Sequence, residues 1–184
     1  MRDFLKLLSI HSGEIDIAGH VLAHGEEAVS APLTEEQSKT ASFLGSCFEA
    51  KPKQCFYNAQ FLCLLALSRG ELLSRLKYVE GYALAGSALP VHHAWVTLDG
   101  AVIDLTLSTK KYSVEELTAY LKNGTPLPRE SDLSDRVLGV IPEGWVYMGV
   151  EYDAGEIGRE FVQREASFSV LDDWENDWKA LRGS

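Results

Sequence analysis

Three residues in the middle of the chain carry side chains that could together attack a carbonyl carbon. They are Cys55, His93 and Asp104, in the order nucleophile, base and orienting acid. A thiolate can attack the carbon, an imidazole can take up the thiol proton, and a carboxylate can hold that imidazole in the correct tautomer. The three residue types therefore predict a Cys-His-Asp triad that transfers acyl groups through a thioester.

A predicted β-hairpin brings two of these residues together. Residues 91–98 and 101–107 are rich in β-branched and apolar side chains and flank an Asp-Gly pair at positions 99–100. An Asp-Gly pair between such runs is a strong signal for a two-residue turn, because both central residues must reach positive φ. The resulting register makes His93 and Asp104 diagonal neighbours on adjacent strands, within reach of each other.

The alternation of side chains along the hairpin separates two faces. One face carries His93, Trp95, Thr97, Val102, Asp104 and Thr106, and the other carries His92, Ala94, Val96, Leu98, Ala101, Ile103, Leu105 and Leu107. The second face is almost entirely apolar, and we interpret it as the buried one. The register therefore selects His93, and not His92, as the partner of Asp104.

The nucleophile is expected at the start of the clearest helix in the chain. Residues 54–70 are apolar on most sides and end at a glycine, which predicts a buried central helix of about 15 residues. Cys55 lies in its first turn, beside unpaired backbone N–H groups, and a helix N-terminus together with an imidazolium favours the thiolate form of a cysteine. Cys63 and Cys47 are expected to lie in the core.

The remaining elements predict an α+β domain that spans residues 1–184, with its core at about 34–152. A capping box at Thr34-Glu35-Glu36-Gln37 opens a helix over 35–48, and another at Ser113-Val114-Glu115-Glu116 opens a helix over 114–122. We further expect strands at 76–84 and 144–152, a helix at 154–165, a short helix or strand near 4–10, a strand at 14–17, a polar loop at 124–136 and a terminal helix at 172–178.

Composition limits the classes of partner. The 184 residues carry a net charge of −10, which argues against nucleic acid and anionic membrane surfaces. No apolar run approaches the roughly 20 residues of a membrane span, and the apolar stretch near Met1 is short for a secretory signal. Three cysteines, an odd number, fit a reduced cytoplasmic setting better than a disulfide framework.

Four short strings give the chain a resemblance to a known superfamily. They are Cys-x-x-Asn-Ala at 55–59, Tyr-Val-Glu-Gly-Tyr-Ala at 78–83, His-Ala-Trp-Val at 93–96 and Val-Ile-Asp-Leu-Thr at 102–106. Together they resemble small bacterial and phage members of the papain-like and transglutaminase-like cysteine hydrolases, over roughly residues 52–107. The resemblance implies that a central helix presents Cys55 against an antiparallel sheet that carries His93 and Asp104, and it implies no cofactor.

The resemblance also implies roles for neighbouring residues. The Cys55 backbone N–H would be one oxyanion donor, and the side chain of Gln54 or Asn58 a second. Papain-like enzymes place a helper glutamine several residues before the cysteine, whereas position 49 is Glu here. Candidate substrate-binding residues are Glu80, Tyr82 and Trp95. A purely structural role for Glu80, as a hydrogen-bond acceptor, is the alternative.

Several functions are compatible with this pattern. The leading one is hydrolysis of an amide or isopeptide bond in a peptide, a protein or a small amide, as by a cysteine peptidase (thiol protease) or amidase. Transfer of the acyl group to an amine, as by transglutaminases, would use the same triad, and a binding or inhibitory module would use the same fold without turnover. A zinc site made of Cys55, His92, His93 and Asp104 is disfavoured, because successive strand residues point to opposite faces.

Overall fold

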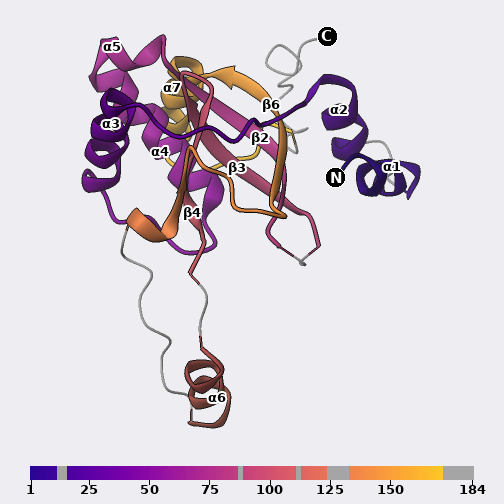
Figure 1. Ribbon diagram of the computed structural model, residues 1–184. Coiled ribbons are helices and arrows are strands. Elements are labelled where there is room, and N and C mark those ends of the chain that lie inside the picture. The colour runs from indigo at the N-terminus through magenta and orange to yellow at the C-terminus, as the bar shows by residue number, and fades with distance from the viewer. Residues whose placement is uncertain (12–15, 87–88, 111–112, 124–132, 172–184) are drawn as a thin grey trace.

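A computed structural model describes residues 1–11, 16–86, 89–110, 113–123 and 133–171. Its centre is a six-stranded antiparallel sheet in the order β1-β6-β2-β3-β4-β5 (Figure 1). The strands are β1 (Glu26–Glu27), β2 (Leu76–Leu84), β3 (Val91–Leu98), β4 (Ala101–Ser108), β5 (Arg136–Leu138) and β6 (Val146–Asp153). The expected α+β class with an antiparallel sheet is confirmed.

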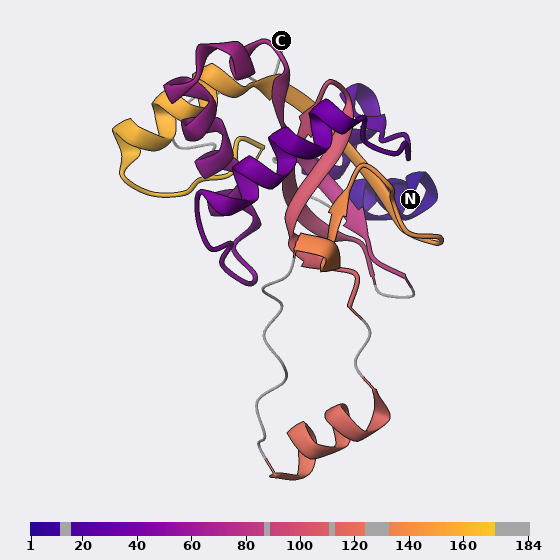
Figure 2. The ribbon, with the colours of Figure 1, turned by 60° about the vertical axis from the view of Figure 1, so that its left-hand side comes forward.

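The longest helix of the described residues, α4 (Cys55–Ser68), packs against β2, β3 and β4. The other helices are α1 (Arg2–His11), α2 (Ile17–His24), α3 (Glu35–Ser46), α5 (Gly70–Leu73), α6 (Val114–Asn123) and α7 (Ala154–Arg164), with a 3-10 turn η1 (Leu133–Asp135). Buried residues of α2, α3, α4 and α7 join one apolar core with the strands. Helix α6 lies away from the sheet in both views (Figures 1 and 2).

Local sequence signals explain the boundaries that matter for the site. Asp99 and Gly100 take φ values of 50° and 83°, and the pairs Leu98↔Ala101 and Val96↔Ile103 confirm the predicted hairpin register. The predicted capping box is also present: the Thr34 side chain accepts from the Gln37 N–H, and the Gln37 side chain accepts from the Thr34 N–H. The hairpin and α3 therefore form where turn and cap chemistry place them.

The sheet is covered on both faces, which corrects the expectation of a single buried hairpin face. Ala94, Val96, Leu98, Ile103 and Leu105 contribute to the core under α4. On the opposite face a second buried cluster contains Val79, Ala83, Trp95, Val102, Val137 and Tyr147, with Ala28, Leu107, Ile141 and Trp145 packed against it. The segments around Ala28 and Ile141 provide this cover, and a pattern read from the hairpin alone does not contain them.

Other expectations were wrong in detail. Cys47 is exposed, because it follows the last turn of α3 instead of facing the core. Gly70 does not end α4: Arg69 is the C-cap, and Gly70 begins the one-turn helix α5. Ile17 begins α2 instead of ending a strand. Of the two alternatives near residues 4–10, the helix is confirmed, since these residues belong to α1.

The remaining expected elements are either present in the structure or lie outside the described residues. The strands at 76–84 and 144–152 and the helices at 114–122 and 154–165 are present as β2, β6, α6 and α7, with ends shifted by up to two residues. The predicted terminal helix at 172–178 and most of the predicted loop at 124–136 lie outside the described residues. No helix among the described residues is long and apolar enough to cross a membrane.

Candidate active site

Cys55 is the first residue of α4 and is only 9% exposed. Its helix has no acidic residue in the first turn, and no side chain caps the N-terminal N–H groups at Gln54. The first N–H groups of a helix lack intrahelical partners and attract negative charge. The free N–H groups at the start of α4 can therefore stabilise a thiolate or an oxyanion nearby.

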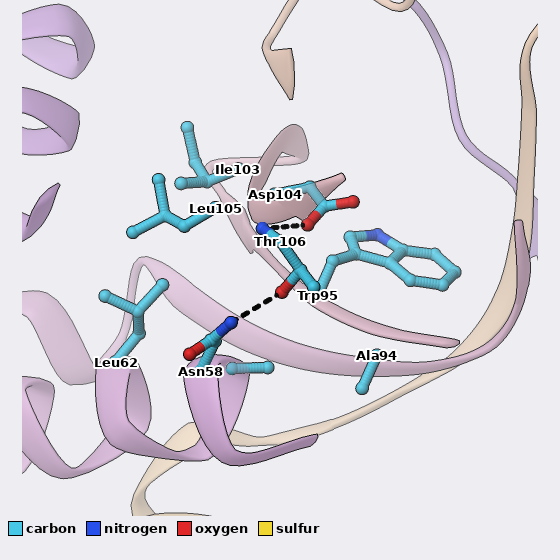
Figure 3. A pocket seen from close by; sticks show the side chains of 9 residues that line it. Asn58, Leu62, Ala94, Trp95, Ile103, Asp104, Leu105 and Thr106 are labelled. Atoms are coloured by element: carbon cyan, nitrogen blue, oxygen red, sulfur yellow. Dashed lines mark hydrogen bonds between the residues drawn. The ribbon is translucent and has the colours of Figure 1, made fainter. Parts of the chain in front are cut away.

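Asn58 fixes the start of α4 in place. Its amide nitrogen donates to the Lys51 carbonyl and to Thr106 Oγ1, both at 2.9 Å, and its amide oxygen accepts from the Lys51 N–H at 2.9 Å. Figure 3 shows the bond to Thr106, two residues beyond Asp104 on β4. One buried side chain thus ties the turn before Cys55 to the strand that carries the acid.

His93 and Asp104 form the contact that the hairpin register predicts. His93 Nε2 lies 2.7 Å from Asp104 Oδ2, and both side chains are almost fully buried. Cys55 is among the groups that raise the pKa of His93, so the thiol lies near the imidazole ring. Because Asp104 engages Nε2, Nδ1 is the ring nitrogen that remains for the thiol. The structure thus brings together all three predicted residues.

The carboxylate of Asp104 has further donors. Oδ1 accepts from the Thr106 N–H at 2.7 Å and from the Leu107 N–H at 3.2 Å. Oδ2 accepts from the Tyr147 hydroxyl at 3.0 Å, in addition to the His93 contact. These bonds hold the carboxylate plane toward the imidazole, as an orienting acid requires.

The pairing of β3 with β4 is confined to the part of the hairpin nearest the turn. The paired residues of β3 and β4 run only from the turn to Val96↔Ile103. Beyond that point β4 is irregular, since its pairing with β5 shifts between Asp104↔Val137 and Ser108↔Arg136. The gap between the strands is lined by Asn58, Ala59, Leu62, Ala94, Trp95, Ile103, Asp104, Leu105 and Thr106 (Figure 3). Helix α4 contributes Asn58, Ala59 and Leu62 to this lining, on the side opposite the two strands.

The electrostatics of the pair favour charge separation. Burial opposes a charged His93 ring, but the charge and hydrogen bond of Asp104, followed by the contact with Cys55, raise the pKa of His93 to about 10. Burial likewise opposes ionisation of Asp104, but the His93 charge and hydrogen bond and the two backbone N–H groups lower its pKa. At neutral pH the site therefore holds an imidazolium against a carboxylate.

The residues predicted to bind substrate lie in different surroundings. Glu80 is fully buried and accepts hydrogen bonds from Tyr78, His92, Ser169, Val170 and Leu171. Trp95 is buried on the opposite face, where its ring stacks with His93 at 6.0 Å between centroids. Tyr82 is half-buried and lies 5.8 Å from the His92 ring. Glu80 thus has a structural role, whereas substrate binding by any of the three stays a prediction.

The two predicted oxyanion donors also differ. Gln54 is exposed, directly precedes Cys55 and makes no capping hydrogen bond with its side chain. Asn58 already donates to Lys51 and Thr106, so an oxyanion would have to replace one of these bonds. Both roles stay predictions.

Sequence reasoning missed Tyr147 and the clamp formed by Asn58. Tyr147 falls in a predicted strand, but its contact with Asp104 requires the order β6-β2-β3-β4, which no local pattern contains. The string Cys-x-x-Asn was visible at 55–58, yet its partner Thr106 lies 48 residues further on.

The described residues contain no group of three or more His, Cys, Asp and Glu side chains that could hold a metal ion. Comparison with known proteins adds no identity to the Cys55, His93 and Asp104 arrangement: no protein-family model, no curated protein and no solved structure matches the chain.

Proposed function

We propose that this protein is a cysteine-dependent acyl-transfer enzyme that hydrolyses an amide or isopeptide bond. The observation that supports the proposal is the 2.7 Å contact of His93 with Asp104, together with the Cys55 thiol near the same ring, in a buried site at a helix N-terminus. A buried thiol, imidazole and carboxylate in contact match the requirements for an activated nucleophile. The proposal agrees with the papain-like and transglutaminase-like resemblance of residues 52–107.

In the proposed mechanism, the Cys55 thiol proton resides on His93 Nδ1 as part of the imidazolium, and the thiolate sulfur attacks the amide carbon. The carbon–nitrogen bond breaks, His93 gives its proton to the departing amine, and an acyl-thioester remains on Cys55. His93 then removes a proton from an entering water, which cleaves the thioester to a carboxylic acid and restores the thiol. The Cys55 N–H and the Gln54 side chain would stabilise the oxyanion of each tetrahedral intermediate.

Thiol reactivity tests the proposal without knowledge of the substrate. The chain provides an internal standard, because Cys47 is exposed whereas Cys55 and Cys63 are buried. Burial alone would make Cys55 the slower thiol. We expect iodoacetamide at pH 7 to alkylate Cys55 at least ten-fold faster than Cys47, as mapped by peptide mass spectrometry, because an imidazolium neighbour favours the thiolate.

His93→Ala should remove this advantage and leave the rate at Cys47 unchanged. If Cys55 reacts no faster than Cys47 in the wild-type protein, or if His93→Ala leaves the Cys55 rate intact, the site is not catalytic and a binding module is the better description. For a reactive protein, incubation with fluorogenic peptide amides with and without added primary amine separates water from amine as the acceptor. Acyl–amine products would indicate a transferase.

A further inference from the structure

We propose that Tyr147 is a positioning residue of the catalytic site: its hydroxyl holds the Asp104 carboxylate in the orientation in which that carboxylate fixes the His93 ring. The inference rests on the proposed function and adds to it a residue from a strand outside the hairpin. Tyr147 touches no reacting atom, so its effect would pass through Asp104 and His93 to the Cys55 thiol.

The contacts of Asp104 support this role. The Tyr147 hydroxyl donates at 3.0 Å to Oδ2, the oxygen that lies 2.7 Å from His93 Nε2. The other oxygen, Oδ1, is held by the N–H groups of Thr106 and Leu107 on its own strand. Rotation of the carboxylate would break bonds at both oxygens. The Tyr147 hydroxyl therefore holds Asp104 Oδ2, the oxygen that contacts His93, in its position.

Small residues on β2 and β6 leave room for the Tyr147 side chain to extend toward Asp104. On β2 its direct partner is Ala83, and the next pair on that face is Gly81↔Gly149. A Cβ atom at Gly149 would lie 2.8 Å from Trp95 Cη2, so the glycine leaves room for the indole. The Tyr147 and Trp95 rings meet edge to face at 5.1 Å between centroids. The small residues on this face of the sheet thus allow the Tyr147 ring on β6 to extend over β2 and β3 toward Asp104 on β4.

The hydroxyl also keeps a constant chemical state over the working range of the site. Burial, followed by the negative charge and hydrogen bond of Asp104, raises the pKa of Tyr147 well above its ordinary value of 10.0. The group therefore remains a donor at every pH at which His93 changes charge. A donor that does not titrate suits a residue that orients a carboxylate and takes no part in proton transfer.

Tyr147→Phe isolates the hydroxyl, because it retains the ring that packs on Trp95. The readout is the iodoacetamide rate at Cys55 relative to Cys47, which needs no substrate. We expect Tyr147→Phe to lower this ratio about ten-fold, as loss of a hydrogen bond to a charged group does. Tyr152→Phe is the matched control: Tyr152 is a buried tyrosine of the same strand whose ring belongs to the α4 side of the sheet, and its variant should keep the wild-type ratio.

Two further measurements separate positioning from a structural role. In an Asp104→Asn background, Tyr147→Phe should change the ratio less than two-fold, because the residue through which it acts has already lost its charge. The Cys55 alkylation rate should change at high pH, where His93 loses its proton. In Tyr147→Phe this change should occur at a lower pH than in the wild-type protein, and the shift should be smaller than in Asp104→Asn. A lower melting temperature alone, with ratio and profile unchanged, would overturn the inference.

The failures of the two proposals are distinguishable. If wild-type Cys55 reacts faster than Cys47 and Tyr147→Phe retains the full advantage, the inference for Tyr147 is wrong and the proposed enzyme stands. If Cys55 in the wild-type protein shows no advantage, the proposed function fails and the positioning role fails with it. An equal loss from Tyr147→Phe in the wild-type and Asp104→Asn backgrounds also contradicts the inference.

Discussion

At the scale of single residues, the site buries two ionisable side chains at positions where apolar side chains would also fill the space. His93 and Asp104 are 2% and 1% exposed, and each is stabilised by the other's charge. A buried ion pair contributes little net stability compared with apolar residues of the same volume, but loss of one partner is strongly destabilising. Such an arrangement is expected where chemistry, and not packing, requires the residue types.

The pH dependence of folding should report the ion pair. The pKa of His93 is raised from 6.5 to about 10, so the stability it contributes is complete below pH 6.5 and is lost as pH rises through about 10. Asp104 has a lowered pKa, so its contribution is present above pH 3.8 and is lost as pH falls below that value. The pair should stabilise the fold most between about pH 4 and pH 6.5.

Urea unfolding between pH 6 and pH 10 measures the histidine part of this prediction. The comparison is best made in a Cys55→Ala background, which removes the thiol next to the ring. With His93 present, the free energy of unfolding should fall by on the order of 2 kcal/mol over this range. His93→Gln in the same background should remove most of the slope. Equal slopes would show that the ring is uncharged in the folded protein.

Cys55→Ala should abolish alkylation at that position yet leave the fold intact. Cys55 is small, lies at a helix start and retains slight exposure, so its removal should cost about 1 kcal/mol or less in urea unfolding. Cys63→Ala provides a contrast, because Cys63 is fully buried between α4 and its neighbours and should cost about 1–2 kcal/mol. A larger loss at Cys55 than at Cys63 would indicate a structural thiol.

At the scale of elements, the geometry of the proposed site depends on how α4 packs against β3 and β4. Asn58→Ala would leave both backbone groups of Lys51 without their partner and free the turn before Cys55. We expect a loss of about 2–4 kcal/mol in the free energy of unfolding, since several buried hydrogen bonds are broken together. Amide hydrogen exchange should rise in residues 51–55.

Thr106→Val is the matched control for the Asn58 clamp. It removes only the acceptor on β4 and leaves both Lys51 bonds in place. Its cost should be about 1 kcal/mol, without faster exchange in the turn. If the two variants cost the same, the tie to β4 and not the tie to Lys51 positions the helix.

The elements also show how far the sequence alone reaches. Asp99 and Gly100 determine a turn, the turn determines the register, and the register brings His93 to Asp104, so a local signal predicts a contact between strands. The contact between Tyr147 and Asp104 has no such chain of local steps, because it depends on β6 pairing with β2 instead of with a neighbour in sequence. Cys47 is expected in the core if the helix continues to residue 48, but α3 ends at Ser46 and Cys47 is exposed. The sequence pattern does not reveal where this helix ends.

At the scale of the whole molecule, Glu80 links the sheet to residues 168–171. Its carboxylate accepts from the N–H groups of Val170 and Leu171, and Gln60 of α4 bonds to the N–H and carbonyl groups of Phe168. Two buried side chains therefore hold the segment that follows α7 against the body of the protein. Glu80, which the sequence predicts as a candidate substrate-binding residue, therefore connects the sheet to the segment after α7.

Glu80→Gln should loosen that segment more than it affects the sheet. We expect a loss of about 2–3 kcal/mol in the free energy of unfolding, because a buried acceptor of several hydrogen bonds loses its charge. Hydrogen exchange should increase first at residues 168–171. Glu151→Gln, an exposed acid on β6, is the control and should cost less than about 0.5 kcal/mol. Uniform exchange across the sheet would contradict this assignment.

The two outermost strands have a consequence for how copies of the protein meet. A sheet edge offers unpaired N–H and C=O groups that can recruit an incoming chain, and long, flat edges promote aggregation. Here the sheet ends in β1, with two residues, and β5, with three. Both outer strands are short, and the negative charge of the two exposed glutamates of β1 opposes pairing with another copy at that position. The two ends of the sheet thus offer little regular strand for edge-to-edge association.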